Sequence, residues 1–504
     1  DKDRNYLKQN GIELAKGTIE NLYEDQFNIY RAFTTAEDEL YLSYVSTDKE
    51  QKAKRQSILI SRIKKMFKNL KEESDVVSKN TSILTAESTF NQMLSNIKDF
   101  KQGKEIDEIW FAVYNWYMQN DEWKPKLKGA IRGFEYKNDA EKITEENIKR
   151  LYGNTLKTSV SRLEQYRECP FSFHLKYGLK LKEREEFVVR PIDTGSFMHE
   201  VIDEFFENTK NIKTIEDQEV KEIVNSIIDE KLSLSKNYIF TSTPRFAVLT
   251  NILKKAILQS ITYIVQQMKN SDFEIAGNEI EFNRKIDNVE ITGKIDRIDT
   301  AQNEQGKYIR IIDYKSSDRS INLNELEAGT QIQLLTYLDT AVEKTKNIPV
   351  GMLYFNLIDP VIKASRNLTD EQIQEELKKQ FRMSGMVLAD VNIIRMMDKN
   401  LQTGASSTIP VTLDKNGDIM DSRSNAITKE QFTLLQNKVK KIIKQIAKEI
   451  LEGNIEIKPT YNKGKKEEAC KYCEYKSICC FNPNVNNYSF IDNKSKKELL
   501  DNLQ

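Results

Sequence analysis

Two stretches of alternating apolar and polar residues lie close together in the middle of the chain, at residues 291–299 and 307–315. A period of two is typical of β-strands that bury one face. The residues between them, 300–306, include Gln, Asn, Glu and Gly, which suit a turn. The pattern therefore predicts a hairpin of neighbouring strands.

Apolar residues at helical spacing predict helices on both sides of this hairpin. Before it, residues 197–206 carry such a pattern, and Thr194 and Ser196 are plausible N-caps. After it, residues 427–453 show the same spacing, with Thr428 at the position of a helix cap.

A further apolar run at residues 350–357 predicts another core strand. Helices combined with such strands predict an α/β fold in which a mixed central sheet is flanked by helices. Residues 1–100 have a mostly helical pattern, apart from one strand-like patch at residues 39–45. We predict two domains, residues 1–157 and residues 158–504, of which the first is mainly helical.

The second domain is expected to open with a helix. Ser161 and Glu164 have the spacing of a capping box. Pro170 follows Cys169 directly and is expected to break the helix there, because proline lacks the N–H that an interior position needs.

The composition predicts a cytoplasmic protein without a membrane partner. Charged residues make up 31% of the 504 positions, and no run of 18 or more apolar residues occurs. The chain starts at Asp1 without a signal-peptide pattern, so we expect the numbering to begin inside a longer polypeptide. With 77 basic and 77 acidic residues, any surface for DNA must come from local segregation of charge.

The second strand of the hairpin ends with an acid and an amine. Side chains alternate between faces, so Ile311, Asp313 and Lys315 share one face. The hairpin also brings Asp296, on the first strand, close to Asp313. Two carboxylates can hold Mg²⁺ or Mn²⁺, and a lysine can orient water or stabilise developing negative charge. The pattern suits phosphodiester hydrolysis, whereas Asp-x-Lys by itself is more typical of a surface hairpin in which Asp313 and Lys315 are solvated.

The five cysteines are unevenly distributed: Cys169 stands alone, and the others lie between residues 470 and 480. A Cys-x2-Cys pair followed by Cys479 is a metal-binding pattern, because its thiolates can approach one ion from a tight turn. Spacing alone favours zinc. Cys480, next to Cys479, is an alternative ligand or a free thiol.

The hairpin resembles the core of the PD-(D/E)xK nucleases, in the branch typified by the RecB nuclease domain. The resemblance rests on Ile-Thr-Gly-Lys-Ile-Asp296 and Ile-Ile-Asp313-Tyr-Lys315. It implies that Asp296 and Asp313 are metal ligands, that Lys315 is the catalytic lysine, and that Tyr314 contributes a backbone carbonyl to the metal.

Two further motifs of this branch lie on the expected sides of the hairpin. Upstream, Gly195-Ser-Phe-Met-His199 is similar to the start of the helix whose histidine is another metal ligand, which implies that role for His199. Downstream, Gln333-Leu-Leu-Thr-Tyr337 is similar to the Gln-x-x-x-Tyr motif, and this spacing places both polar side chains on one helical face. The resemblance implies that Gln333 and Tyr337 position the lysine or the DNA backbone.

Residues 161–179 are similar to the stretch that opens the nuclease domain of AddB subunits of AddAB helicase-nucleases. The cysteine of that stretch ligates a 4Fe–4S cluster together with three others near the C-terminus, which implies this cluster in place of zinc. The implied ligands are Cys169, Cys470, Cys473 and Cys479. Residues 33–44 resemble a late part of the superfamily-1-type helicase core of the same subunits, although no ATP-binding P-loop occurs in this chain.

These resemblances imply an exonuclease subunit of an ATP-dependent helicase-nuclease that processes DNA ends for recombinational repair. The subunit would cut the 5′-ended strand, and an AddA-like partner would supply ATP-driven translocation. Two alternatives stay open at this stage. One is a free-standing iron–sulfur exonuclease, and the other is a DNA-binding scaffold subunit without catalytic activity.

Overall fold

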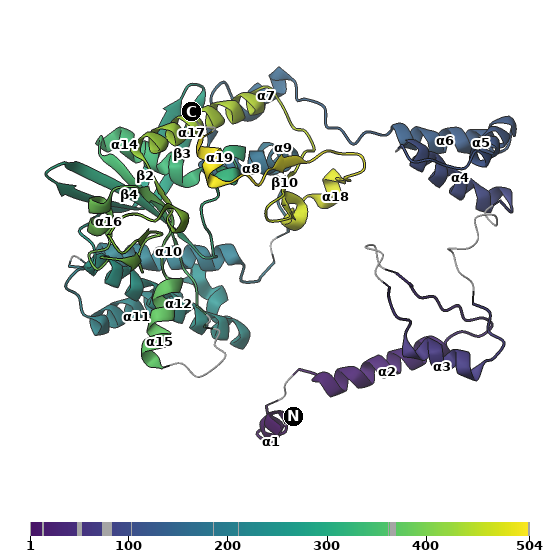
Figure 1. Cartoon of the computed structure of the whole chain (residues 1–504), viewed down its shortest axis with the longest axis horizontal. Coiled ribbons are helices and arrows are strands. Elements are labelled where there is room, and N and C mark those ends of the chain that lie inside the picture. The colour runs from purple at the N-terminus through teal and green to yellow at the C-terminus, as the bar shows by residue number, and fades with distance from the viewer. Residues whose placement is uncertain are drawn as a thin grey trace. The chain divides into compact units, whose positions relative to one another are not determined.

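The computed structural model describes residues 2–12, 15–47, 53–72, 83–101, 103–184, 186–209, 211–360, 362 and 369–501. The chain divides into two compact units, Asp1–Phe134 and Glu135–Gln504. Figure 1 shows that the first unit, in purple and blue, consists of helices and loops, whereas the second contains the sheets.

The smaller unit has six α-helices among its described residues. They are α1 (Lys2–Gln9), α2 (Thr18–Thr34), α3 (Ile58–Met66), α4 (Ala86–Lys101), α5 (Ile109–Gln119) and α6 (Lys124–Arg132). The last three pack around a core of Met93, Trp110, Tyr117 and Leu127. The helical prediction is confirmed. The strand predicted at residues 39–45 is wrong, because these residues find no partner strand and Tyr41 is exposed.

The larger unit is built on a mixed sheet with the strand order β1-β3-β4-β5-β6-β9, in which β2 also pairs with β3. The strands are β1 (Leu156–Thr158), β2 (Glu274–Ile286), β3 (Val289–Asn303), β4 (Gly306–Lys315), β5 (Ile348–Asn356), β6 (Ser384–Leu388) and β9 (Ala426–Ile427). Parallel pairs (β1 with β3, β4 with β5, β6 with β9) alternate with antiparallel ones. The predicted fold class and the core strand at β5 are confirmed.

The predicted hairpin is the antiparallel pair of β3 and β4, but its turn is shorter than expected. Asn303 pairs with Gly306, so residues 300–303, which the sequence assigned to the connection, extend the strand. Asn303 also accepts a hydrogen bond from the backbone N–H of Gln305 through its side chain. This local bond closes a tight turn and allows polar residues to continue the ladder.

Helices cover both faces of the sheet (Figure 1). Helices α10 (Pro191–Asn208), α11 (Asp217–Ser233) and α12 (Pro244–Lys269) pack together, and α10 contacts β2. Helix α14 (Gln333–Thr345) lies on β4 and β5 from the other side and packs against α17 (Lys429–Leu451). The hydrophobic core between these layers fixes the position of the hairpin strands.

Shorter elements complete the larger unit. They are the helices α7 (Glu145–Tyr152), α8 (Val160–Glu168), α9 (Pro170–Phe173), α13 (Leu323–Ala328), α15 (Asp370–Gln380), α16 (Val391–Met397), α18 (Lys476–Cys479) and α19 (Lys496–Asp501), and the strands β7 (Gly404–Ala405), β8 (Thr412–Leu413), β10 (Thr460–Asn462), β11 (Glu467–Glu468) and β12 (Ser489–Ile491). Strands β11, β10 and β12 form a separate small sheet beside the C-terminal cysteines.

Two of the predicted helix starts are wrong. Helix α10 starts earlier than expected, with Arg190 as N-cap and Pro191 in the first turn, so Thr194 and Ser196 lie inside the helix. The fixed φ of proline is suited to a first helical position. The Arg190 N–H donates to Asp193 Oδ2 at 2.9 Å, which satisfies one free donor of the helix end.

Helix α8 is capped by Ser159, whose hydroxyl accepts the Arg162 N–H, and the capping box predicted for Ser161 and Glu164 is wrong. Glu164 instead makes tertiary contacts. The break at Pro170 is confirmed, because α8 ends before it and α9 begins with it. The predicted cap of α17 is also confirmed, since Thr428 bonds reciprocally with Gln431.

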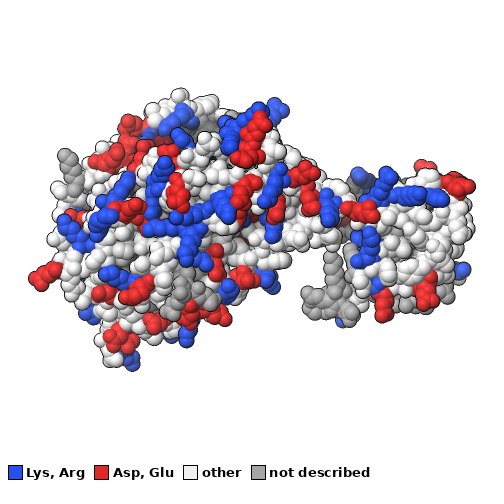
Figure 2. Space-filling model, turned by 90° about the horizontal axis from the view of Figure 1, so that it is seen from above, with Lys and Arg blue, Asp and Glu red and all other residues white. Residues whose placement is uncertain are grey.

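Charge is mixed over the surface. In Figure 2, lysine and arginine side chains are interspersed with acidic ones on the face that is seen, in agreement with a formal net charge of zero. Among the residues that the structure describes, no helix combines the length and apolar character needed to cross a bilayer.

Candidate active site

Two carboxylates meet where β3 and β4 run side by side. The antiparallel register pairs Arg297 with Ile312, so the adjacent residues Asp296 and Asp313 lie opposite each other. The Tyr314 backbone N–H donates a hydrogen bond of 2.8 Å to Asp296 Oδ2, which fixes this carboxylate. The hairpin therefore brings together the two acids that the sequence singled out.

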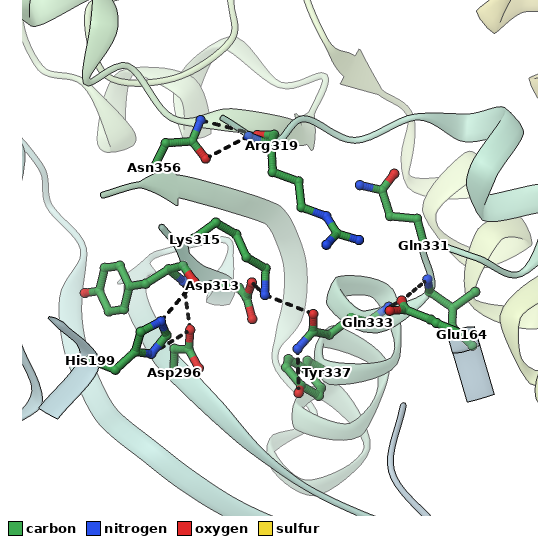
Figure 3. A network of polar contacts seen from close by, with 12 residues as sticks. Glu164, His199, Asp296, Asp313, Lys315, Arg319, Gln331, Gln333, Tyr337 and Asn356 are labelled. Atoms are coloured by element: carbon green, nitrogen blue, oxygen red, sulfur yellow. Dashed lines mark hydrogen bonds and ion pairs between the residues drawn. The ribbon is translucent and has the colours of Figure 1, made fainter. Parts of the chain in front are cut away.

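Lys315 lies beside these acids and is held from two directions (Figure 3). Its Nζ is 2.5 Å from Asp313 Oδ2 and donates to Gln333 Oε1 at 3.1 Å. Gln333 Nε2 in turn donates to the Tyr337 hydroxyl at 2.9 Å. The two residues of the Gln-x-x-x-Tyr motif thus form one chain of hydrogen bonds that ends on the lysine.

Helix α10 brings His199 to the same place. The His199 ring nitrogen Nε2 lies 3.1 Å from the Tyr314 carbonyl oxygen, and Nδ1 lies 3.6 Å from Asp296 Oδ2. Gly195, one turn earlier, faces Ser316, and a Cβ at this position would lie 3.4 Å from the serine Oγ. The start of α10 therefore lies close to the end of β4, at a distance that leaves room for ordinary contact.

Glu279 on β2 is a member of this site that sequence analysis missed. One ligand atom each from His199, Glu279 and Asp296 lies within 4.8 Å of the others, an arrangement able to hold a metal ion. Glu279 has a positive φ of 47°, unusual for a residue other than glycine, and pairs with Lys294 at 2.7 Å. Only the pairing of β2 with β3 places it opposite Asp296.

The site concentrates acidic groups away from solvent. Burial, reinforced by the charge of Asp313, raises the pKa of Asp296 to about 7. Burial raises the pKa of Asp313 as well, although Lys315 acts in the opposite direction. For His199, burial lowers the pKa, but Glu279 and Asp296 outweigh this effect and raise it overall. The shifts of the two acids reflect the loss of water and, for Asp296, repulsion by Asp313, whereas the shift of His199 reflects its attraction to the acids.

The donor set fits a divalent cation. Asp313 is 1% exposed, and its Oδ1 accepts no hydrogen bond from the described residues. A hard cation would satisfy this oxygen and would cancel the repulsion between Asp296 and Asp313. The cavity in front of these residues has a volume of about 500 Å³ and also exposes Lys315 and Gln333.

Glu164, from α8, fixes the start of the helix that carries Gln333. Its Oε1 accepts the backbone N–H groups of Ile332 and Gln333, at 2.6 and 2.9 Å. The acid is thus placed at the positive end of α14. No local pattern could have revealed this contact, because Glu164 and Ile332 are separated by 168 residues.

Four cysteines converge on a second cavity, of about 290 Å³, in the same unit. Cys169 lies between α8 and α9, whereas the other three come from the segment around α18. The cysteines that line the cavity are Cys169, Cys470, Cys473 and Cys479. The structure therefore brings together the set that the sequence comparison implied.

Cys480 is placed differently. It is exposed, does not line the cavity, and has a left-handed backbone with φ of 48°.

Burial, followed by Glu468 and the neighbouring thiols, raises the pKa of Cys470 to about 12. Burial also raises the pKa of Cys169 and Cys479. Metal ions would offset this effect by binding the thiolate forms, so the four residues fit a metal cluster.

Comparison with known families agrees with this site. Residues 157–480 match the PD-(D/E)XK nuclease superfamily, and residues 80–133 match the ATP-dependent helicase/deoxyribonuclease AddB fifth domain. The first match covers more than half of the chain and includes the hairpin, the α10 histidine and the four cysteines. The chain therefore belongs to the PD-(D/E)XK nuclease superfamily, whose members act with a divalent metal ion.

The sequence of the chain is also similar to individual proteins that share one name. The chain is 37% identical to the B subunit of the ATP-dependent helicase/deoxyribonuclease of Clostridium novyi, over 100% of this chain and 47% of that protein. The proteins of the same name from Clostridium acetobutylicum and Clostridium tetani are each 38% identical, over 99% of this chain and 46% of theirs. The chain spans about half the length of these relatives. The resemblance to AddB proteins is confirmed.

Proposed function

We propose that this chain cleaves DNA phosphodiester bonds as the nuclease subunit of a larger enzyme. Asp296, Asp313 and His199, with the Tyr314 carbonyl, would hold Mg²⁺ or Mn²⁺. The observation that supports this most directly is the pair of largely buried carboxylates that face each other beside Lys315. Repulsion between two buried carboxylates costs stability, and a bound divalent cation would offset it.

The residues divide the chemistry between them. Asp296, Asp313 and His199 would hold the ion, which would supply polarisation of the scissile phosphate and a lower pKa for a water molecule. Lys315 places a positive charge where negative charge develops on the phosphate. Asp313 and Gln333 hold its amine from two sides, so little reorganisation is needed during the reaction.

Gln333 and Tyr337 hold the lysine side chain through successive hydrogen bonds. The Gln333 amide nitrogen donates to Tyr337, which leaves its oxygen directed at Lys315. The Lys315 ammonium can only donate, so it selects this orientation of the amide group, and the Tyr337 hydroxyl accepts from the amide nitrogen. We assign both as positioning residues, with Glu164 supporting Gln333 through the helix end.

The four cysteines would hold a 4Fe–4S cluster with a structural role. Cys169 is about 300 residues from the other three in sequence, so a shared cluster would join the start of the nuclease domain to its end. The cavity they line contains none of the acids at the divalent-metal site. We therefore assign no catalytic step to the cluster.

We further propose the setting in which this chain acts. The nuclease domain would comprise residues 158–504, and residues 1–157 would derive from a helicase-like region. The relatives described above are subunits of an ATP-dependent helicase/deoxyribonuclease. This likeness supports a heterodimer with an AddA-like partner, acting on duplex ends and single strands of DNA. In this assembly the chain would cut the 5′-ended strand, in the cytoplasm, during recombinational repair.

The test is the Mg²⁺-dependent degradation of linear DNA by the assembled complex, with the native chain or with Lys315→Ala. Each strand is labelled at its 5′ end in turn, and DNA binding is measured in parallel. We expect the variant to bind DNA and to lose cleavage of the 5′-ended strand only. Loss of cleavage on the other strand would reverse the polarity, and equal cleavage by both proteins would leave a non-catalytic scaffold as the function.

A further inference from the structure

The loop that follows β4, residues 316–322, is held firmly although much of it is exposed. The Arg319 N–H donates to Asn356 Oδ1 at 3.2 Å, and its carbonyl accepts the Ser384 hydroxyl at 2.6 Å. Gln331 bonds to the backbone of the loop on both sides of Ile321, at the Asn322 N–H and the Ser320 carbonyl, at 2.7 and 2.8 Å. The backbone of Arg319 is therefore fixed by side chains from two strands of the central sheet.

The side chain of Arg319, in contrast, has no hydrogen bond or ion pair with any residue that the structure describes. Its guanidinium lies 5.9 Å from the ring centroid of Tyr354 and points toward the space between Lys315 and Gln331 (Figure 3). The two fully buried arginines, Arg297 and Arg310, are both paired with Asp299. Arg297, for example, bonds to a carboxylate at 2.6 Å. An arginine that is partly buried and unpaired retains five donors for a ligand.

The nearby acids Glu164 and Asp313 form no ion pair with the Arg319 guanidinium and bond to other groups. Glu164 contributes to its electrostatic surroundings, but the Glu164 oxygen Oε1 is bonded to the N–H groups at the start of α14. Asp313 is paired with Lys315. The guanidinium therefore lies among acids that favour its charge while its own donors stay available.

We propose that Arg319 binds a phosphate of the DNA strand next to the phosphate that is cut. Arginine matches the geometry of phosphate oxygens, and an anchored backbone reduces the entropy lost on binding. The position of Arg319, in the loop that begins directly after Lys315, would give the strand a second contact and set its register in the site. This inference rests on the proposed function, because it assumes that a DNA strand enters the cavity.

The test compares Arg319→Gln with the native chain on short single strands that carry one neutral methylphosphonate at successive positions. In the native complex, neutralising the contacted phosphate should lower kcat/KM about 10- to 100-fold, the range for a hydrogen bond between charged groups. In Arg319→Gln the same replacement should have almost no further effect. Arg319→Lys, which keeps the charge but loses the fork of donors, should retain part of the sensitivity.

Arg150→Gln is the matched control, because Arg150 is exposed and paired with Glu146. It should show the native pattern of sensitivity. Thermal midpoints of all variants separate a folding defect from a lost contact. An unchanged pattern in Arg319→Gln, with native stability, would overturn the inference. If even the native complex does not cut, the proposed function fails, and the same series measured as binding in EDTA still decides the role of Arg319.

Discussion

Replacing Glu164 by glutamine perturbs one buried charge and little else. Glu164 is 7% exposed, and a single carboxylate oxygen accepts both N–H groups at the start of α14. Glutamine offers an acceptor oxygen of the same reach but cannot ionise. The variant is therefore expected to keep the helix end in place while it loses the response of the carboxylate to pH.

The size of this response follows from burial. Burial raises the pKa of Glu164 to about 7, compared with an ordinary value of 4.5. Between these values the unfolded chain has released the proton that the folded chain retains, so the free energy of unfolding falls as pH rises. This difference in pKa corresponds to roughly 3 kcal/mol of the free energy of unfolding. That contribution is lost progressively as pH rises between about 4.5 and 7.

Thermal unfolding gives the measurement. The larger unit spans residues 135–504, which is 370 residues. With an unfolding entropy of about 2 cal/mol/K per residue, 3 kcal/mol corresponds to about 4 °C in Tm. We expect the Tm of native protein minus that of Glu164→Gln to fall by about this amount between pH 5 and pH 8. Groups that titrate alike in both proteins, such as Asp296, cancel in the difference.

Glu146→Gln serves as the control, because Glu146 is exposed on α7 and is paired with Arg150. The difference in Tm between this variant and the native protein should stay constant over the same pH range. A constant difference for Glu164→Gln would refute the account, since it would mean that burial does not hold the proton on this carboxylate.

Three further outcomes are expected. Asp313→Asn should lower the rate of DNA cleavage about 100-fold or more while the complex still binds DNA, and a native rate would remove Asp313 from the metal site. Glu279→Gln should weaken Mn²⁺ binding about 10- to 100-fold in a calorimetric titration, whereas the exposed Glu281→Gln should not. Cys169→Ala should lose iron and lower the Tm, and retention of both would exclude Cys169 as a ligand.

The sequence was most informative where the structure depends on local geometry. Antiparallel pairing and the alternation of side chains are enough to bring Asp296, Asp313 and Lys315 together, because one tight turn joins their strands. The same holds for Gln333 and Tyr337, which are one helical turn apart and are bonded to each other. Both arrangements depend only on the period of the element.

Sequence reasoning failed where a contact depends on a distant partner. Glu279 joins the site through the pairing of β2 with β3, and Glu164 through the packing of α8 on α14. Neither of these contacts produces a periodic pattern of apolar and polar residues in the sequence. The start of α10 was misplaced for a different reason, because Pro191 competes successfully with Thr194 for the first turn.

The start and end of the larger unit are joined by hydrogen bonds, and this has a consequence for the timing of folding. Asn138 donates to the Cys479 carbonyl at 2.8 Å, and Tyr166 donates to the Asn454 carbonyl at 3.3 Å. Contacts of such long sequence separation form late. At about 5–20 residues per second on the ribosome, the stretch from Lys315 to Cys480 takes roughly 10–30 s to synthesise. The acids are thus made well before the segment that secures α8, and the larger unit cannot complete its packing until that segment has been synthesised.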